Sequence, residues 1–266
     1  MFGVCGKPHK INLDEQKLML ASQQIGNGPR VIFVPGFTQT RETWQDLTSD
    51  LADQFEVVAI DAPNHGESCD ISLNLESGAR AIGEVGGAAA YVGYSLGGRF
   101  CLTLALAEPQ KVSRLVLIST TAGIEDKDMR LARIQSDEEI AKRIEQIGVP
   151  KFIDEWLAQP LFAGLTIDTD QRSMRLKNTA IGLSSSLRLC GAGRQQPTWS
   201  RLKDLSMPIL VVAGADDEKY RLLAERLVAE IGSNATLAII NDSGHTPHLE
   251  QPEKFSNVLR GFLSTE

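Results

Sequence analysis

A serine flanked by glycines, at the point where an apolar run becomes a helix, constrains this chain more than any other feature of its sequence. Residues 89–92 form a buried-strand pattern that leads into GYSLG at 93–97, and an apolar helical pattern at 96–108 follows at once. Side chains at Gly93 and Gly97 would collide with neighbouring backbone in so tight a turn. The turn holds the hydroxyl of Ser95 above a helix N-terminus, whose free N–H groups favour developing negative charge. The motif therefore predicts a nucleophile at the edge of a sheet.

Short apolar runs alternate with amphipathic stretches along the chain, a pattern typical of a mostly parallel central sheet flanked by helices. We expect buried strands at residues 31–34, 57–60, 89–92, 115–119, 209–213 and 237–240, and an antiparallel edge strand at 17–23. We expect helices at residues 43–54, 96–108, 221–231 and 252–263. Only helical patterns occur from about 121 to 207. We therefore predict one α/β domain over residues 1–266, with a helical cap inserted at about 121–207.

Two later strands end in residues that complete a catalytic triad for Ser95. One runs into Gly-Ala-Asp-Asp, where Asp217 is preferred to Asp216 because the G-x-x-D spacing fits the strand end. The last runs into Asn-Asp-Ser-Gly-His, where His245 is preferred to His248 because its Ser-Gly-His turn directly follows the strand. The order Ser, Asp, His is that of the α/β-hydrolase fold. We therefore predict that His245 accepts the serine proton and that Asp217 fixes the imidazole tautomer and stabilises its cation.

An oxyanion hole is predicted where the first buried strand ends in Pro-Gly-Phe-Thr at 35–38. The backbone N–H groups of Phe37 and Leu96 are expected to point at the developing oxyanion. Pro35 stands where histidine is usual, but backbone groups are the donors, so the prediction is unchanged. His65, in the stretch DAPNHGES, is expected to fix a loop rather than to act as a base.

Charge and cysteine content limit the partners of the chain. Its net charge of −7 argues against nucleic acid or an anionic membrane as the main partner. Four cysteines lie far apart without metal-ligand spacing, so we expect reduced thiols in a cytoplasmic protein and no metal site. The start of the chain has no signal-peptide pattern, and no run of about 18 apolar residues predicts a membrane span. Nothing in the sequence indicates the oligomeric state.

Arg99 follows Ser95 by one helical turn and lies on roughly the same face. A cation in the first turn of a helix is disfavoured by about 0.3–1 kcal/mol. Its placement therefore favours an anion-binding role beside the nucleophile, and a salt bridge to a surface carboxylate is the alternative. Between 121 and 207 the chain has 13 Lys and Arg against 12 Asp and Glu. These cap cations form solvated helix faces, or some of them face the cleft and receive an anionic substrate.

Several stretches together resemble one family, the 2-succinyl-6-hydroxy-2,4-cyclohexadiene-1-carboxylate (SHCHC) synthases of menaquinone biosynthesis. They are VGYSLGGRF, FIDEWLAQPLFAGL, SLRLCGAGRQQPTW, GADDEKY and SGHTPHLEQP. The likeness runs from the Pro-Gly loop at 35–36 almost to the C-terminus and includes the cap pattern W-x-x-x-P-x-F-x-x-L. The resemblance implies a lyase that removes a proton from a polycarboxylate 5-enolpyruvyl precursor and expels pyruvate. It also implies a triad that acts as a base, and no metal or organic cofactor.

The resemblance also implies substrate-binding residues. Arg133 and Trp156 match family positions, although Trp156 could equally pack within the cap. The next family arginine falls at Arg175, with Lys177 two residues on, and only one of these can supply a third cation because they point to different helix faces. Tyr94 and Tyr220 are further candidates.

Two rival functions use the same residues. A carboxylesterase or thioesterase acting on a small acidic or aromatic ester would use the same nucleophile and oxyanion hole for acyl transfer. A non-catalytic receptor on a hydrolase scaffold could also retain the triad. Replacement of Arg99 separates the first rival from the lyase, because hydrolysis of a neutral ester does not need that cation.

Overall fold

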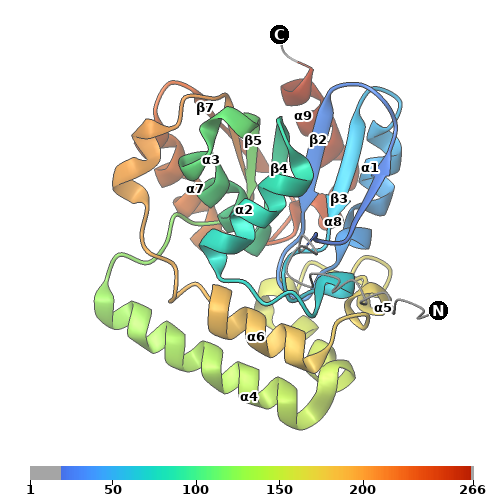
Figure 1. The fold of residues 1–266 in the computed structure, drawn as a ribbon, viewed down its shortest axis with the longest axis vertical. Helices are drawn as coiled ribbons and strands as arrows, with labels where there is room; N and C mark the ends of the chain where they lie inside the picture. The colour runs from blue at the N-terminus through green and yellow to red at the C-terminus, as the bar shows by residue number, and fades with distance from the viewer. Residues whose placement is uncertain (1–18, 265–266) are drawn as a thin grey trace, which may run out of the picture.

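A seven-stranded sheet, in the order β1-β3-β2-β4-β5-β6-β7, forms the centre of the computed structural model, which describes residues 19–264 (Figure 1). Its strands are β1 (Ser22–Ile25), β2 (Arg30–Val34), β3 (Glu56–Ile60), β4 (Ala89–Tyr94), β5 (Val112–Ile118), β6 (Ile209–Gly214) and β7 (Ala235–Ile240). All neighbouring strands are parallel except β1 and β3, which are antiparallel. The mostly parallel sheet expected from the sequence is confirmed.

Two strand predictions need correction. The edge strand expected at 17–23 is β1 at Ser22–Ile25, because its register with β3 extends up to a turn in which Gly26 and Gly28 adopt positive φ. Residues 17 and 18 lie outside the described part of the chain. The strand expected to be buried at 237–240 is largely accessible, and Leu237 is 38% exposed. The reason is that β7 is the last strand of the sheet and has one neighbour only.

Alternate residues of each strand face opposite layers of helices, as the pleat of a strand requires. Ile32 and Val34 pack with α2, α3 and α7, whereas Val31 and Phe33 pack with α1 and α9. The bounds of the helices around the sheet are α1 (Gln45–Leu51), α2 (Leu75–Gly86), α3 (Leu96–Ala107), α7 (Glu218–Ile231), α8 (Pro247–Glu250) and α9 (Pro252–Leu263). The sequence patterns missed α2. The buried face of this helix includes Gly78, where a Cβ would lie 2.6 Å from the side chain of Phe100.

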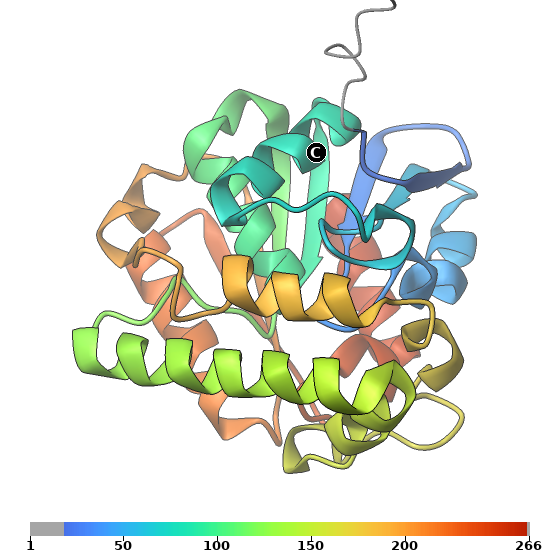
Figure 2. The same cartoon turned by 60° about the horizontal axis from the view of Figure 1, so that its bottom comes forward.

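Between β5 and β6 the chain leaves the sheet and crosses its carboxyl edge as α4 (Lys127–Leu157), α5 (Arg172–Arg175) and α6 (Ala180–Cys190). Figure 1 shows α4 and α6 side by side below the strands, and Figure 2 shows the same pair in front of the strand ends. Gly148 interrupts α4 with φ 75°, so the chain reverses there. The two helices share a small core that includes Ile144, Phe152 and Leu187.

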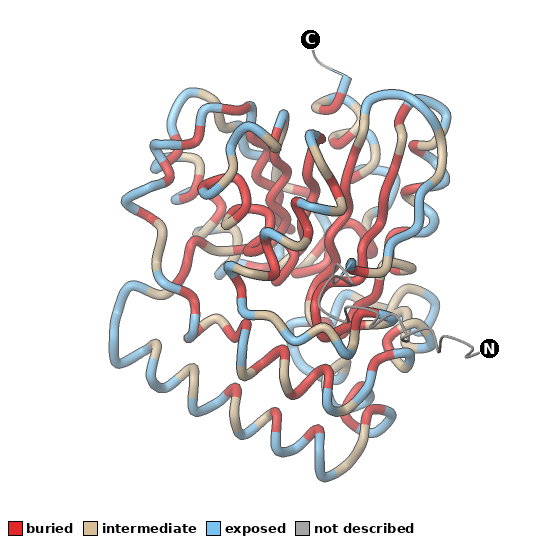
Figure 3. The backbone as a smooth tube through the Cα atoms, viewed as in Figure 1, coloured by how far each residue is buried: buried red, intermediate tan, exposed pale blue. Residues whose placement is uncertain are grey.

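The distribution of burial follows these layers. The inner strands β2 to β6 are buried along most of their length, whereas the outer face of α4 is exposed (Figure 3). Over residues 19–264, no helix is both long enough and apolar enough to cross a membrane.

Candidate active site

Ser95 lies at the sharp turn between β4 and α3. Its backbone adopts φ 50° and ψ −108°, a strained conformation for a residue with a side chain. A Cβ at Gly93 would lie 2.4 Å from the carbonyl oxygen of Gly97, and one at Gly97 would lie 2.0 Å from the carbonyl oxygen of Val34. Only glycine fits at these two positions. The side chain of Ser95 stands at the first turn of α3, at the carboxyl edge of the sheet.

Asp217 and His245 meet at the same edge. Nδ1 of His245 lies 2.7 Å from Oδ2 of Asp217, and the two side chains are 3% and 7% exposed. Asp216 is exposed and makes no such contact. Since Nδ1–H donates to the carboxylate, Nε2 of His245 is left as the acceptor for a serine proton. The ring of Tyr220 packs 4.3 Å from the imidazole, centroid to centroid.

Ser95 and His245 line one cavity of about 330 Å³ beneath the cap. The structure records no hydrogen bond from the Ser95 hydroxyl to His245, although both residues are described. Such bonds are often long in free enzymes and tighten when substrate binds. The structure therefore brings Ser95 and His245 to one cavity, with Asp217 hydrogen-bonded to His245 from outside the cavity wall.

Phe37 and Leu96 also line this cavity. Leu96 is the first residue of α3, so its N–H has no intrahelical acceptor. The N–H of Phe37 has no hydrogen-bond partner among residues 19–264. Two residues of the wall of the Ser95 cavity therefore have backbone donors without an acceptor in the described chain, as an oxyanion hole requires.

Arg99 is buried in the cavity wall. Its guanidinium donates to the carbonyl oxygen of Cys190 at 2.7 Å and to the side chain of Gln195 at 3.4 Å, and it forms no ion pair with any described carboxylate. Burial lowers its pKa below the usual arginine value. The alternative of a surface salt bridge is therefore excluded, and Arg99 is a desolvated cation one turn from the nucleophile.

The cavity wall is strongly biased in charge. It contains Arg99, Arg133 and Lys219, and no aspartate or glutamate of the described chain. Nε of Arg133 pairs with Oδ1 of Asp137 at 2.7 Å from one side, which leaves its other donors free for a ligand. A cavity with three cations, in a chain with a net charge of −7, is suited to a substrate with several anionic groups.

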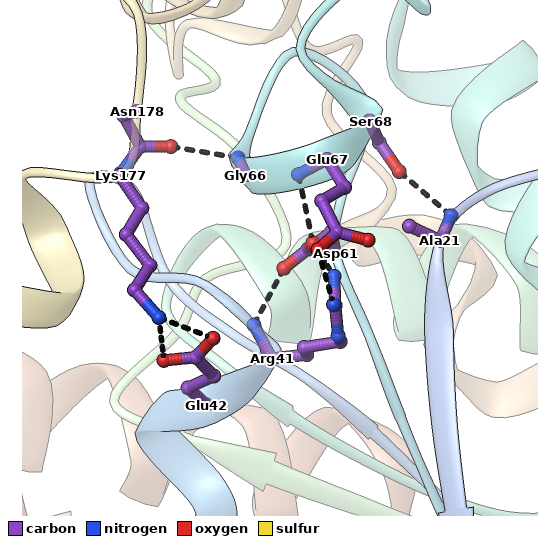
Figure 4. A network of polar contacts seen from close by, with 9 residues as sticks. All are labelled: Ala21, Arg41, Glu42, Asp61, Gly66, Glu67, Ser68, Lys177 and Asn178. Atoms are coloured by element: carbon purple, nitrogen blue, oxygen red, sulfur yellow. Dashed lines mark hydrogen bonds and ion pairs between the residues drawn. The ribbon is translucent and has the colours of Figure 1, made fainter.

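The structure does not bring Lys177, a predicted substrate contact, to the Ser95 cavity. Its ammonium pairs with Glu42 at 2.6 Å on the surface and lies outside the cavity wall (Figure 4). Arg175 is 1% exposed and does not line the cavity either. Its guanidinium is buried against Thr38, in the loop at residues 35–38 that carries Phe37 and is called the oxyanion loop below. The α5 helix is only four residues long, and packing against the body, rather than helix periodicity, decides where its side chains point.

Aromatic residues complete the wall. Trp156 packs 5.2 Å from Phe37 and also contacts Phe162, so it combines the two roles considered for it, in cap packing and in the cavity lining. Tyr94 and Tyr220 line the cavity, and the rings of both contact His245.

His248 does not compete with His245. It lies outside the wall of the Ser95 cavity, stacked on Trp44 at 4.6 Å and against Tyr94 at 4.5 Å. Burial lowers its pKa to about 3, so it is neutral at pH 7. A larger cavity of about 940 Å³ beside it contains neither Ser95 nor His245.

Sequence reasoning missed Lys219 and Glu250. Lys219 looks like an ordinary solvated residue in the first turn of a helix, and only the fold places it on the cavity. Glu250 accepts hydrogen bonds from the N–H groups of Gly244 and Thr246, at 2.7 and 2.9 Å, and so holds both neighbours of His245. Its spacing from Thr246 is one residue longer than a capping box, so the pattern gives no signal. In the described chain, no group of three or more His, Cys, Asp or Glu side chains could hold a metal ion.

Comparison with known proteins identifies the class. Residues 31–258 match the model of the alpha/beta hydrolase family. The chain therefore belongs to the alpha/beta hydrolase family, as its sheet order and strand–serine–helix turn indicate.

Relatives within that family carry the name SHCHC synthase. The enzyme of Serratia proteamaculans (strain 568) is 28% identical over 92% of this chain and 98% of its own length. A Bacillus subtilis (strain 168) protein that carries the same synthase name provisionally is 33% identical over 95% of this chain and 96% of its own length. The solved structure of MenH from S. aureus superimposes with a TM-score of 0.86, at 28% identity over 91% of this chain and 97% of that one. The resemblance predicted from the sequence is confirmed.

Proposed function

We propose that this chain is a SHCHC synthase, a carbon–oxygen lyase of menaquinone biosynthesis that converts 2-succinyl-5-enolpyruvyl-6-hydroxy-3-cyclohexene-1-carboxylate to the cyclohexadiene product and pyruvate. The observation that carries the proposal is a triad cavity whose wall has three cations and no described carboxylate. A neutral ester does not require such a wall. A substrate with several carboxylates does. The free thiols Cys69, Cys101 and Cys190 are in keeping with a cytoplasmic enzyme.

The proposed mechanism uses Ser95 as a base. Its hydroxyl proton passes to Nε2 of His245, and the alkoxide removes a proton from the ring carbon of the substrate. The electron pair of that C–H bond forms a ring double bond at C2–C3, the existing double bond shifts from C3–C4 to C4–C5, and the C5–O bond to the enolpyruvyl group breaks. The leaving group departs as the enolate of pyruvate, and its methylene carbon takes up the proton that His245 received from Ser95, which gives pyruvate. The negatively charged Asp217 stabilises the imidazolium during the transfer, at 2.7 Å from Nδ1.

The N–H groups of Phe37 and Leu96 supply the electrostatic part of catalysis. They lie beside the hydroxyl and stabilise the oxygen that carries developing charge, either an enolate or a carboxylate oxygen of the substrate. Arg99 and Arg133 hold the remaining carboxylates, so binding orients the acidic C–H bond toward Ser95.

The experiment gives purified protein the 5-enolpyruvyl precursor and follows pyruvate release with a lactate dehydrogenase assay. We expect turnover that Ser95→Ala abolishes. Arg99→Ala should lower kcat/KM about 100-fold, because removing a buried charge contact costs about 2–5 kcal/mol. Hydrolysis of p-nitrophenyl acetate by the same variant should change less than about twofold. Absence of pyruvate release at micromolar enzyme, with rapid ester hydrolysis, would overturn the lyase in favour of an esterase.

A further inference from the structure

Thr38 has an unusual backbone for its residue type. It directly follows Phe37, is fully buried and adopts φ 69°. This left-handed conformation is unfavourable for a β-branched side chain and persists only where surrounding contacts hold it. The conformation matters because it sets the direction of the loop that presents the N–H of Phe37.

Each polar group of Thr38 has a partner. Its N–H donates to Nε2 of His65 at 3.4 Å, its carbonyl oxygen accepts from Nδ2 of Asn178 at 2.7 Å, and its hydroxyl accepts from the guanidinium of Arg175. Nδ1 of His65 lies 2.9 Å from the carbonyl oxygen of Pro63, so this nitrogen is the donor and Nε2 is the acceptor that Thr38 needs. Two of the three partners belong to the cap.

Asn178 also joins a second loop of the body. Its Oδ1 accepts from the N–H of Gly66 at 2.9 Å, next to His65 (Figure 4). The donor role of Nδ2 and the acceptor role of Oδ1 fix the orientation of the amide. The side chain of Asn178, which is 6% exposed, therefore connects the cap to the loop that contains Thr38 and to the loop that contains His65.

Arg175 is almost fully buried and does not line the Ser95 cavity, as expected for a structural cation rather than for a residue that contacts a ligand. Its Nε donates to the carbonyl oxygen of Asp170 at 2.9 Å, and no carboxylate among residues 19–264 forms an ion pair with it. With Thr38 on one side and Asp170 on the other, the guanidinium joins the oxyanion loop to the segment that precedes α5.

We propose that Asn178 and Arg175 are positioning residues that latch the cap onto Thr38 and thereby hold the N–H of Phe37 in the oxyanion hole. The inference rests on the proposed function only through the role of Phe37, and it applies to any reaction that uses this hole. It assigns the cap a part in transition-state stabilisation, separate from Arg133, the cap cation that lines the cavity. Loosening the latch lowers kcat and leaves KM close to its original value.

Asn178→Asp tests the latch, because the carboxylate still accepts from Gly66 but cannot donate to Thr38. Lys177→Ala is the matched control, since it removes the adjacent cap-to-body contact with Glu42 and nothing near Thr38. The readout that needs no SHCHC precursor is the rate at which a fluorophosphonate labels Ser95, because its phosphoryl oxygen occupies the oxyanion hole. Circular dichroism and thermal unfolding check that the variants are folded.

We expect Asn178→Asp to label at least tenfold more slowly than the wild type, and Lys177→Ala to label within twofold of it. In pyruvate release, Asn178→Asp should lower kcat by a similar factor with KM changed less than twofold. Labelling of Asn178→Asp at the wild-type rate overturns the latch, as does a wild type that is not labelled. If Asn178→Asp does not fold, Asn178→Ser, which keeps a donor of shorter reach, replaces it with the same criterion. A wild type that labels rapidly but releases no pyruvate refutes the lyase and leaves the latch measurable.

Discussion

At the scale of single residues, Asp217 performs two tasks with its two oxygens. Oδ2 accepts from His245 at 2.7 Å, and Oδ1 accepts from the N–H of Tyr220 at 3.2 Å and caps α7. The first task needs a negative charge, because the imidazole becomes a cation during proton transfer. The second needs only an acceptor oxygen, which an amide also provides.

Asp217→Asn separates these two tasks. We expect kcat to fall by about 10³–10⁴, because an amide does not enforce the right tautomer or stabilise the imidazolium. The folded state should lose little stability, because asparagine caps a helix as well as aspartate does. Asp216→Asn, at the exposed neighbouring position, should keep full activity in the pyruvate assay. Equal losses in the two variants would contradict the assignment of Asp217.

At the scale of elements, the short helix α8 supports the catalytic histidine through Glu250. The carboxylate holds the N–H groups of Gly244 and Thr246 and also accepts from the hydroxyl of Thr246 at 2.7 Å. These bonds fix the loop between β7 and α8, on which His245 is placed. The position of the His245 imidazole therefore depends on a residue that does not line the cavity.

Glu250→Gln removes the charge and one of the two acceptor oxygens. Because hydrogen bonds to charged groups contribute about 1.5–3 kcal/mol, we expect the free energy of unfolding to fall by a similar amount. We expect kcat for pyruvate release to fall about tenfold as His245 loses its fixed position. Glu253→Gln, an exposed substitution in the first turn of α9, is the control and should change kcat less than twofold. Urea unfolding and the pyruvate assay measure both effects, and a fully active Glu250→Gln would refute this role.

At the scale of the whole molecule, two buried histidines link stability to pH. Burial lowers the pKa of His65 to about 4 and that of His248 to about 3, from the usual value near 6.5. Below pH 6.5 the unfolded chain takes up protons at these positions while the folded protein does not. Folding stability must therefore fall as the pH decreases from about 6.5 toward 4.

His248→Phe tests this linkage, because phenylalanine keeps an aromatic ring between Trp44 and Tyr94 and cannot titrate. Each histidine should contribute a slope of about 1.4 kcal/mol per pH unit between pH 6 and pH 5. The variant should therefore show a shallower pH dependence in urea unfolding than the wild type, whatever its absolute stability. Above pH 7.5 neither histidine titrates, so both slopes should approach each other there. Identical slopes below pH 6 would refute the linkage.

The sequence by itself determined the parts of this protein that depend on local patterns. Steric limits at Gly93 and Gly97 identify the serine turn, and apolar runs identify six strands to within a few residues. The meeting of Ser95, Asp217 and His245 follows because each lies shortly after the carboxyl end of a strand, and parallel strands place these ends at one edge. These features require no knowledge of how the cap sits on the sheet.

Only the tertiary structure decided which charged side chains face the cavity. Arg175 and Lys177 match or neighbour a family position, yet one is buried against Thr38 and the other pairs with Glu42 on the surface. Lys219 lines the cavity although nothing in its sequence context distinguishes it. The physical reason is that long side chains take their direction from contacts between segments far apart in the chain, and the docking of the cap creates those contacts.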